Sequence, residues 1–153
     1  MTSKPKSATP SSPAEERLFL AVLKTADALG QEAEQLTKSI GLTATQYNVL
    51  RILRGAGPDG LPCRAIGERM ISRDPDMTRL LDRMEKGGLI TRARQKDDRR
   101  VVKTQITDAG LSLLQKLDQP MRDLHRRQFQ HMAAAQLKTL VDLLDALRNR
   151  GPE

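Results

Sequence analysis

Aromatic side chains are almost absent from this sequence. Phe19, Tyr47 and Phe129 are the whole set, and there is no tryptophan. Modules that bind RNA or single-stranded nucleic acid stack bases on aromatic rings, so the composition argues against an OB-fold or an RNA-recognition sheet. The core must therefore be aliphatic.

Cysteine is equally scarce, because Cys63 stands alone. One thiol cannot form an intramolecular disulfide or a CxxC metal pair, which is typical of a protein of the reducing cytoplasm. Cys63 shares an apolar helix face with Ile66 and Met70, which favours a buried structural thiol over a redox switch. His125 and His131 fall on different faces of a helix and do not predict a metal site.

Long apolar runs and the motifs of common enzymes are missing too. No apolar segment has the length of a transmembrane helix. Residues 1–13 are rich in Ser, Pro and Lys, and they predict a disordered tail rather than a signal peptide. There is no P-loop, HExxH motif or nucleophile elbow. We therefore expect a cytoplasmic protein that is not membrane-bound and has no catalytic residue, metal or cofactor.

Acidic residues are outnumbered, which points to a polyanionic partner. The chain has 26 Lys and Arg against 19 Asp and Glu, a net charge of +7. Such an excess bears on partners rather than on the fold. The densest basic segment contains Arg92, Arg94, Lys96, Arg99, Arg100 and Lys103. Basic runs also occur on ordinary solvated surfaces, so the place of this run in the fold decides its meaning.

The first third of the chain has helical periodicity. Apolar residues at three- and four-residue spacing predict a long helix over 14–39. Thr43 and Gln46 form a capping box that begins a second helix, and the glycine-rich loop 55–60 ends it.

Residues 62–87 have the pattern of a helix-turn-helix. A short helix is predicted over 62–70, and Asp74 and Pro75 predict the N-cap and first residue of the next helix, which Gly87 ends. That helix has arginines on its outer face, and its inner stripe consists of Met77, Leu80, Leu81 and Met84.

A β-hairpin is predicted next, from strand-like runs over 89–94 and 101–106 around a charged tip at 96–100. Thr107 then caps a helix that Pro120 should kink or interrupt. More apolar surface is present in the outer helices than one small module can cover, so a second copy of the chain is expected to meet it. The stripe that lacks a partner is Leu114, Leu117, Met121 and Leu124.

Three segments of this chain resemble the MarR family of bacterial regulators. Residues 42–50 are similar to the family's LTxxQ(Y/F)xVL helix, and residues 78–90 resemble its recognition helix and exit. Residues 98–110 match its DxR…(L/I)TxxG wing pattern. The three segments occur in the family's order and have long helices on both sides. The resemblance therefore covers the chain from Ala14 to Arg150.

The resemblance implies a mainly α fold with a small β-hairpin wing. A single domain over 14–150 would comprise a winged helix-turn-helix module at 42–106 and dimerisation helices at 14–40 and 108–150. It also implies a homodimeric repressor that binds a near-palindromic operator in double-stranded DNA. Such repressors are frequently released by a small ligand.

DNA contacts are expected first from the helix over 74–87. A DNA-reading helix needs polar side chains near its N-terminal half, and arginine makes a bidentate contact with guanine. Asp82 is interpreted as an orienting partner of a nearby arginine. The predicted contacts in and before this helix are Ser72, Arg73, Asp76, Thr78, Arg79 and Arg83.

The hairpin supplies the remaining predicted contacts. The resemblance implies that Arg100 enters the minor groove and that Asp98 holds it by a charge-assisted hydrogen bond. Arg94, Lys96 and Arg99 fit contacts with phosphates, which give affinity without sequence information.

A small aromatic or phenolic effector is expected at the junction between the dimer helices and the winged module. Leu29, Ala33, Tyr47 and Arg51 lie on helices that border this junction, and Arg51 could pair with an anionic group. The alternative is that Tyr47 and Arg51 simply pack and cap there.

Two other functions fit the same residues. One is a winged-helix protein that binds DNA without sequence preference, and the other is a protein-interaction module. The basic wing argues against the second, since protein interfaces tend to be depleted in lysine. An enzyme is the weakest alternative.

Overall fold

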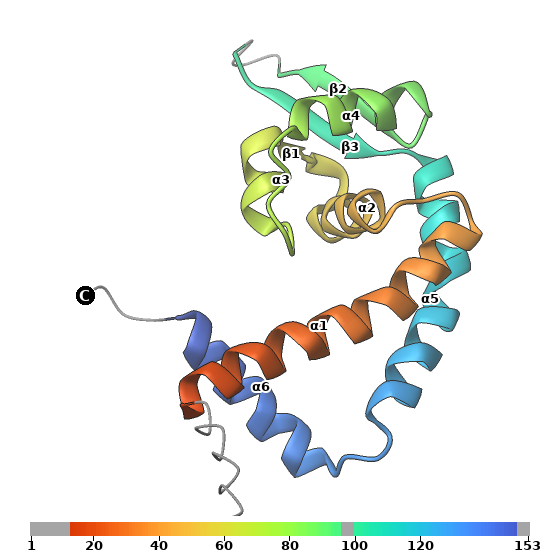
Figure 1. The fold of residues 1–153 in the computed structure, drawn as a ribbon. Coiled ribbons are helices and arrows are strands. Elements are labelled where there is room, and N and C mark those ends of the chain that lie inside the picture. Colours follow the sequence, from red (N-terminus) through yellow and green to blue (C-terminus); the bar gives the residue numbers. More distant parts are fainter. Residues whose placement is uncertain (1–12, 96–99, 150–153) are drawn as a thin grey trace, which may run out of the picture.

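The structure, a computed structural model, describes residues 13–95 and 100–149 (Figure 1). The central part of the chain forms a small module, and three long helices form an open frame beside it (Figure 1). The elements are α1 (Ala14–Ser39), α2 (Ala44–Ala56), the 3-10 turn η1 (Gly57–Asp59), β1 (Leu61–Pro62), α3 (Cys63–Arg69), α4 (Met77–Lys86), β2 (Ile90–Arg94), β3 (Val102–Ile106), α5 (Asp108–Phe129) and α6 (Ala134–Arg148).

The central module is a winged helix: α2, α3 and α4 pack beside a small antiparallel sheet. The predicted hairpin is confirmed, since Ile90 pairs with Ile106 and Arg94 with Val102. The core is aliphatic, as the shortage of aromatic residues requires. Its fully buried members include Val49, Leu50, Leu53, Ile66, Leu80, Leu81, Met84, Ile90 and Leu114.

A third strand, β1, was not predicted. Leu61 pairs with Thr104 and Pro62 with Lys103, which gives the strand order β1-β3-β2. Proline is tolerated here because β1 is an edge strand. The chain enters β1 through Gly60, where an added Cβ would lie 2.4 Å from the Thr104 carbonyl oxygen. A two-residue strand has no periodicity, so only its pairing reveals it.

Capping explains where α2 and α4 begin. The capping box is confirmed: Gln46 N–H donates to Thr43 Oγ1 at 3.1 Å, and Thr43 N–H donates to Gln46 Oε1 at 3.0 Å. The N-cap predicted at Asp74 and the first helical residue predicted at Pro75 are both wrong, since α4 begins at Met77. Asp74 instead accepts the Asp76 N–H at 2.8 Å and closes a turn, and Asp76 caps α4 by accepting the Arg79 N–H at 3.2 Å. Both aspartates suit a cap, and the backbone path selects the second.

The start of α5 is docked onto the exit of α4. Thr107 caps α5 as predicted, by accepting the Gly110 N–H at 3.1 Å, and its hydroxyl donates to the Gly88 carbonyl at 2.7 Å. A Cβ at Gly110 would lie 2.5 Å from the Leu89 carbonyl oxygen, so the close approach requires glycine. The interruption considered at Pro120 does not occur, since α5 continues to Phe129.

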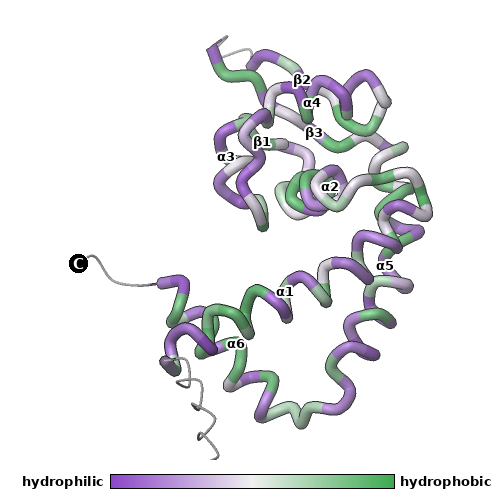
Figure 2. Tube along the Cα trace, viewed as in Figure 1, coloured by the Kyte–Doolittle hydropathy of each residue, from purple (hydrophilic) through white to green (hydrophobic). Residues whose placement is uncertain are grey.

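The apolar stripe that was predicted to lack a partner is covered by the chain itself. Leu114, Leu117, Met121 and Leu124 are buried within this one chain, where α5 packs against α1 and α2. Most of the exposed large apolar side chains lie instead on the first half of α1 and along α6, and Phe19 is 62% exposed. On these two helices they are Leu18, Phe19, Leu20, Leu23, Leu140, Val141, Leu143, Leu144 and Leu147. Figure 2 shows the hydrophobic residues along these two helices.

None of the helices among the described residues is both long and apolar enough to cross a lipid bilayer.

Candidate nucleic-acid interface and adjoining cavity

Helix α4 presents a polar face to solvent. Its buried side carries the predicted apolar stripe, with Leu80, Leu81 and Met84 buried, so the opposite side is fixed outward. Thr78, Arg79 and Arg83 are exposed on it. Ser72 and Arg73 are exposed in the turn before α4. The structure therefore gathers the predicted residues of this region on accessible surface.

Asp76 has two roles at the start of α4. Besides capping the helix, its carboxylate lies 3.2 Å from Arg79 Nε. This contact ties a side chain that is itself 78% exposed to the start of α4.

The wing is described only in part. Arg94 is exposed at the end of β2, and Arg100 is exposed just before β3. Lys96, Asp98 and Arg99 lie outside the described residues, and with them the predicted contact between Asp98 and Arg100.

Arg92 belongs to the basic run but does not serve as a free surface cation. Its guanidinium donates to Asp82 through Nη2 and to Glu85 Oε2 through Nε at 2.9 Å and Nη2 at 2.7 Å. The Arg92 N–H also donates to Glu85 Oε1, at 3.0 Å. These contacts, hereafter the Arg92 bridge, raise the pKa of Arg92, chiefly through the hydrogen bonds that its guanidinium donates to Glu85. Asp82, interpreted from the sequence as the orienting partner of a nearby arginine, accepts a hydrogen bond from Arg92. The bridge joins β2 of the wing to α4.

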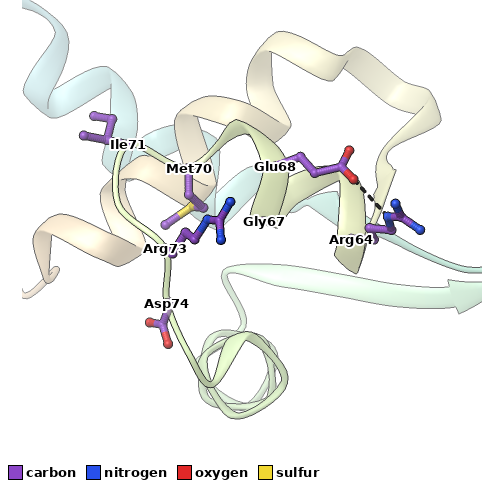
Figure 3. Close-up of a pocket in the computed structure, with 7 residues that line it drawn as sticks. All are labelled: Arg64, Gly67, Glu68, Met70, Ile71, Arg73 and Asp74. Atoms are coloured by element: carbon purple, nitrogen blue, oxygen red, sulfur yellow. Dashed lines mark hydrogen bonds and ion pairs between the residues drawn. The ribbon is translucent and has the colours of Figure 1, made fainter. Parts of the chain in front are cut away.

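A hollow of about 540 Å³ lies between α3 and the turn that leads to α4 (Figure 3). Arg64 and Glu68 form an ion pair of 2.9 Å on α3, and Arg73 and Asp74 line the hollow from the turn. Arg64 is an exposed cation beside this surface that the sequence analysis left out. Its charge is partly offset by Glu68.

A second cavity lies where the module meets the long helices. Its volume is about 260 Å³, and it is lined by residues of α1, α2, α5 and the turn before α4. Ala33, Tyr47 and Arg51 line it, whereas Leu29 is not among the lining residues. The charged or titratable groups on its described walls are Tyr47, Arg51 and His125, and none is a carboxylate. The cavity therefore suits an apolar body with an anionic or hydrogen-bonding group.

Tyr47 and Arg51 are stacked on each other in the wall of this cavity. The Arg51 guanidinium carbon lies 5.7 Å from the centroid of the Tyr47 ring. Partial burial raises the pKa of the Tyr47 phenol above its ordinary value, although Arg51 and Arg54 oppose that shift. Tyr47 is therefore a neutral hydrogen-bond donor at physiological pH. Arg54 pairs with both carboxylate oxygens of Asp118 at 3.0 Å and joins α2 to α5 beside it.

Comparison with known proteins agrees with this geometry. The family model described as MarR family matches residues 42–102, the winged module. A crystal structure of a MarR transcription factor from Planctomyces limnophilus is 39% identical, covers 88% of this chain and 97% of that one, and superposes with a TM-score of 0.65. The chain belongs to the MarR family.

Two other proteins that are similar to this chain bear on function. The transcriptional repressor IacR of Pseudomonas putida is 29% identical over 117 residues, which are 76% of this chain and 69% of IacR. PcaV of Streptomyces coelicolor, solved in complex with its natural ligand, is 26% identical with a TM-score of 0.67, covering 82% of this chain and 89% of PcaV. Both are named as transcriptional regulators and not as enzymes.

We predict that Arg92 and Arg94, two arginines of one strand, differ in their effect on folding. Arg92→Met breaks the Arg92 bridge and should lower the free energy of unfolding by about 1–2 kcal/mol, because two carboxylates lose a charged donor. Arg94 has no ion-pair partner among the described residues, so Arg94→Met should leave stability within about 0.5 kcal/mol of the wild type. Urea unfolding measures both. Equal stabilities of the two variants would show that the bridge contributes nothing to folding.

Proposed function

We propose that the protein is a homodimeric repressor that binds a near-palindromic site in double-stranded DNA and is released by a small aromatic or phenolic anion. It would act in the cytoplasm, where the bacterial chromosome lies. The observation that carries the proposal is the Arg92 bridge, which holds an exposed, arginine-bearing α4 and a basic wing in one rigid unit of a MarR-family chain.

In this proposal α4 enters the major groove and Arg79 reads a base. The exposed guanidinium of Arg79, held at the start of α4 by Asp76, supports this, because an arginine can donate to both O6 and N7 of a guanine. Arg83, Thr78, Ser72 and Arg73 would contact neighbouring base edges and phosphates. In the wing, Arg100 would enter the minor groove, with Asp98 holding it. Arg94, Lys96 and Arg99 would contact phosphates.

Dimer formation is supported by the apolar surfaces of α1 and α6. Residues 18–20 are Leu-Phe-Leu, three consecutive exposed apolar side chains that point to more than one side of α1. A helix that is apolar all round is stable in water only when its sides are covered. We therefore assign residues 14–40 and 108–150 to dimerisation and 42–106 to DNA binding. Two copies of the module would reach two half-sites about one DNA turn apart.

The effector would occupy the cavity between α1, α2, α5 and the turn before α4. Arg51 supplies a positive charge, the neutral Tyr47 phenol supplies a donor, and Ala33 contributes to an apolar wall. PcaV, with 26% identity, binds a natural ligand, which supports ligand control in this chain as well. An occupant that prefers the state unable to bind DNA by about 1.4 kcal/mol lowers DNA affinity about tenfold.

Base readout by Arg79 is the first prediction of this function. Arg79→Ala should weaken operator binding by about 1–3 kcal/mol and relax base preference at one position in each half-site. Lys116→Ala removes an equal charge from the exposed surface of α5 and should change base preference at no position. Selection of bound sequences from a random library measures the preference. An unaltered preference in Arg79→Ala removes Arg79 as a reader, and equal wild-type affinity for scrambled duplexes would favour a protein that binds DNA without sequence preference.

The second prediction concerns assembly. The wild type should sediment as a dimer of the 17.0 kDa chain at micromolar concentration. Phe19→Glu should shift the protein toward monomer, because it places a charge in the apolar surface that a second copy covers. Val102→Glu is the matched control, since Val102 is an exposed apolar residue of β3 and belongs to neither α1 nor α6. A monomeric wild type would contradict the proposed dimer.

The third prediction concerns the cavity. Among phenols and aromatic carboxylates, at least one compound should release the operator and raise the melting temperature of the free protein. Arg51→Met should reduce the response to carboxylates, and Tyr47→Phe the response to compounds that accept a hydrogen bond from the phenol. Fluorescence anisotropy of labelled operator measures release. If no compound changes either quantity, DNA binding is constitutive.

A further inference from the structure

The turn between α3 and α4 carries two predicted DNA contacts but has little to hold it. It comprises the seven residues 70–76, from the end of α3 to the start of α4. Ser72 and Arg73 are exposed, and the Ile71 side chain is 85% exposed, so neither packing nor burial fixes the middle of the turn. Met70 is half-buried and packs against the core at one end, and Asp76 caps α4 at the other.

Asn48 on α2 holds the middle of this turn. The Ile71 N–H donates to Asn48 Oδ1 at 2.9 Å, across 23 positions of sequence. Among the described residues this is the one hydrogen bond that joins the turn to α2. Asn48 is half-buried, and the two residues that follow it, Val49 and Leu50, are fully buried and anchor α2 in the core. A rigid helix therefore supplies the acceptor that positions the turn.

The same hydrogen bond lies in the wall of the 260 Å³ cavity. Asn48, Ile71 and Ser72 are all lining residues, together with Tyr47 and Arg51. In Figure 3 the chain leaves α3 at Met70, passes Ile71 and Arg73, and reaches α4 through Asp74. A molecule in the cavity would therefore lie against both residues that this hydrogen bond joins.

We propose that Asn48 is a positioning residue for DNA readout, and that an occupant of the cavity weakens DNA binding by breaking the hydrogen bond between Asn48 and Ile71. The proposal rests on the function proposed above. An occupant with a hydrogen-bond donor competes with the Ile71 N–H for Asn48 Oδ1, and an apolar occupant separates the two groups sterically. Either way the turn loses its link to α2, and Ser72, Arg73 and the N-terminus of α4 lose their fixed position.

Two substitutions separate the hydrogen bond from the volume of the side chain. Asn48→Leu keeps the approximate size and removes the acceptor, whereas Asn48→Asp keeps an acceptor oxygen. In Asn48→Leu the Ile71 amide should exchange with solvent faster, and the ratio of operator to scrambled-duplex affinity should fall about three- to tenfold. In Asn48→Asp the slow exchange and the affinity ratio should be restored toward the wild type. The ratio cancels the general effect of the added charge on DNA binding.

Exchange is measured by NMR and the affinities by anisotropy, on the full chain. The melting temperature is recorded alongside, because a lower stability alone would speed exchange at many amides and not at Ile71 in particular. An Asn48→Leu protein that keeps the wild-type affinity ratio overturns the positioning role. So does faster exchange spread evenly over the module.

Coupling to the cavity is tested with 4-hydroxybenzoate and 2,4-dichlorophenol. If either lowers the operator affinity of the wild type, that effect should shrink in Asn48→Leu, although calorimetry still detects binding of the compound. A full response in Asn48→Leu overturns coupling through Asn48. A wild type that responds to neither compound overturns both the coupling and the ligand response with this pair of probes, and the positioning role is then decided by the exchange and affinity data alone.

Discussion

The guanidinium of Arg92 lies between two carboxylates of α4, and this arrangement sets the relation between the two parts of the interface. One arginine from β2 donates to Asp82 and Glu85, and the backbone of the same residue donates to Glu85 as well. A hairpin attached to its module only at its base would be free to twist. With the Arg92 bridge in place, the wing and the exposed face of α4 have one fixed separation, which is what reading a duplex requires.

The second constraint acts where the module meets the long helices. Thr107 bonds both to the start of α5 and to the Gly88 carbonyl at the exit of α4, and Gly110 allows the two backbones to touch. Arg54 and Asp118 join α2 to α5 on the other side of the junction. The positions of α4 and α5 are thus linked by short polar contacts. The cavity is lined by α1, α2, α5 and the turn before α4, so it lies at the connection between the frame and the winged module.

Features that depend on neighbouring residues were predictable. The capping box of Thr43 and Gln46 and the cap at Thr107 use contacts three positions apart, and the structure has both. The hairpin was predicted from two strand-like runs on either side of a charged tip. The stripe of Leu80, Leu81 and Met84 determined which side of α4 is buried and therefore which side carries Thr78, Arg79 and Arg83. These outcomes need only the periods of helix and strand, together with hydrogen bonds closed within one turn.

Features that depend on distant partners were decided by the tertiary structure alone. Arg92 and Arg94 are two positions apart and so face the same side of β2. Only Arg92 reaches Asp82 and Glu85 of α4, because Arg94 lies two residues farther toward the tip of the hairpin. The α5 stripe found its cover in α1 and α2 of the same chain, which moved the unpartnered surface to α1 and α6. Likewise Asn48 has no visible role in the sequence, since its partner Ile71 is 23 positions away. Composition and local periodicity determined the elements and the family, whereas chain folding brought together the charges and amides on which the site depends.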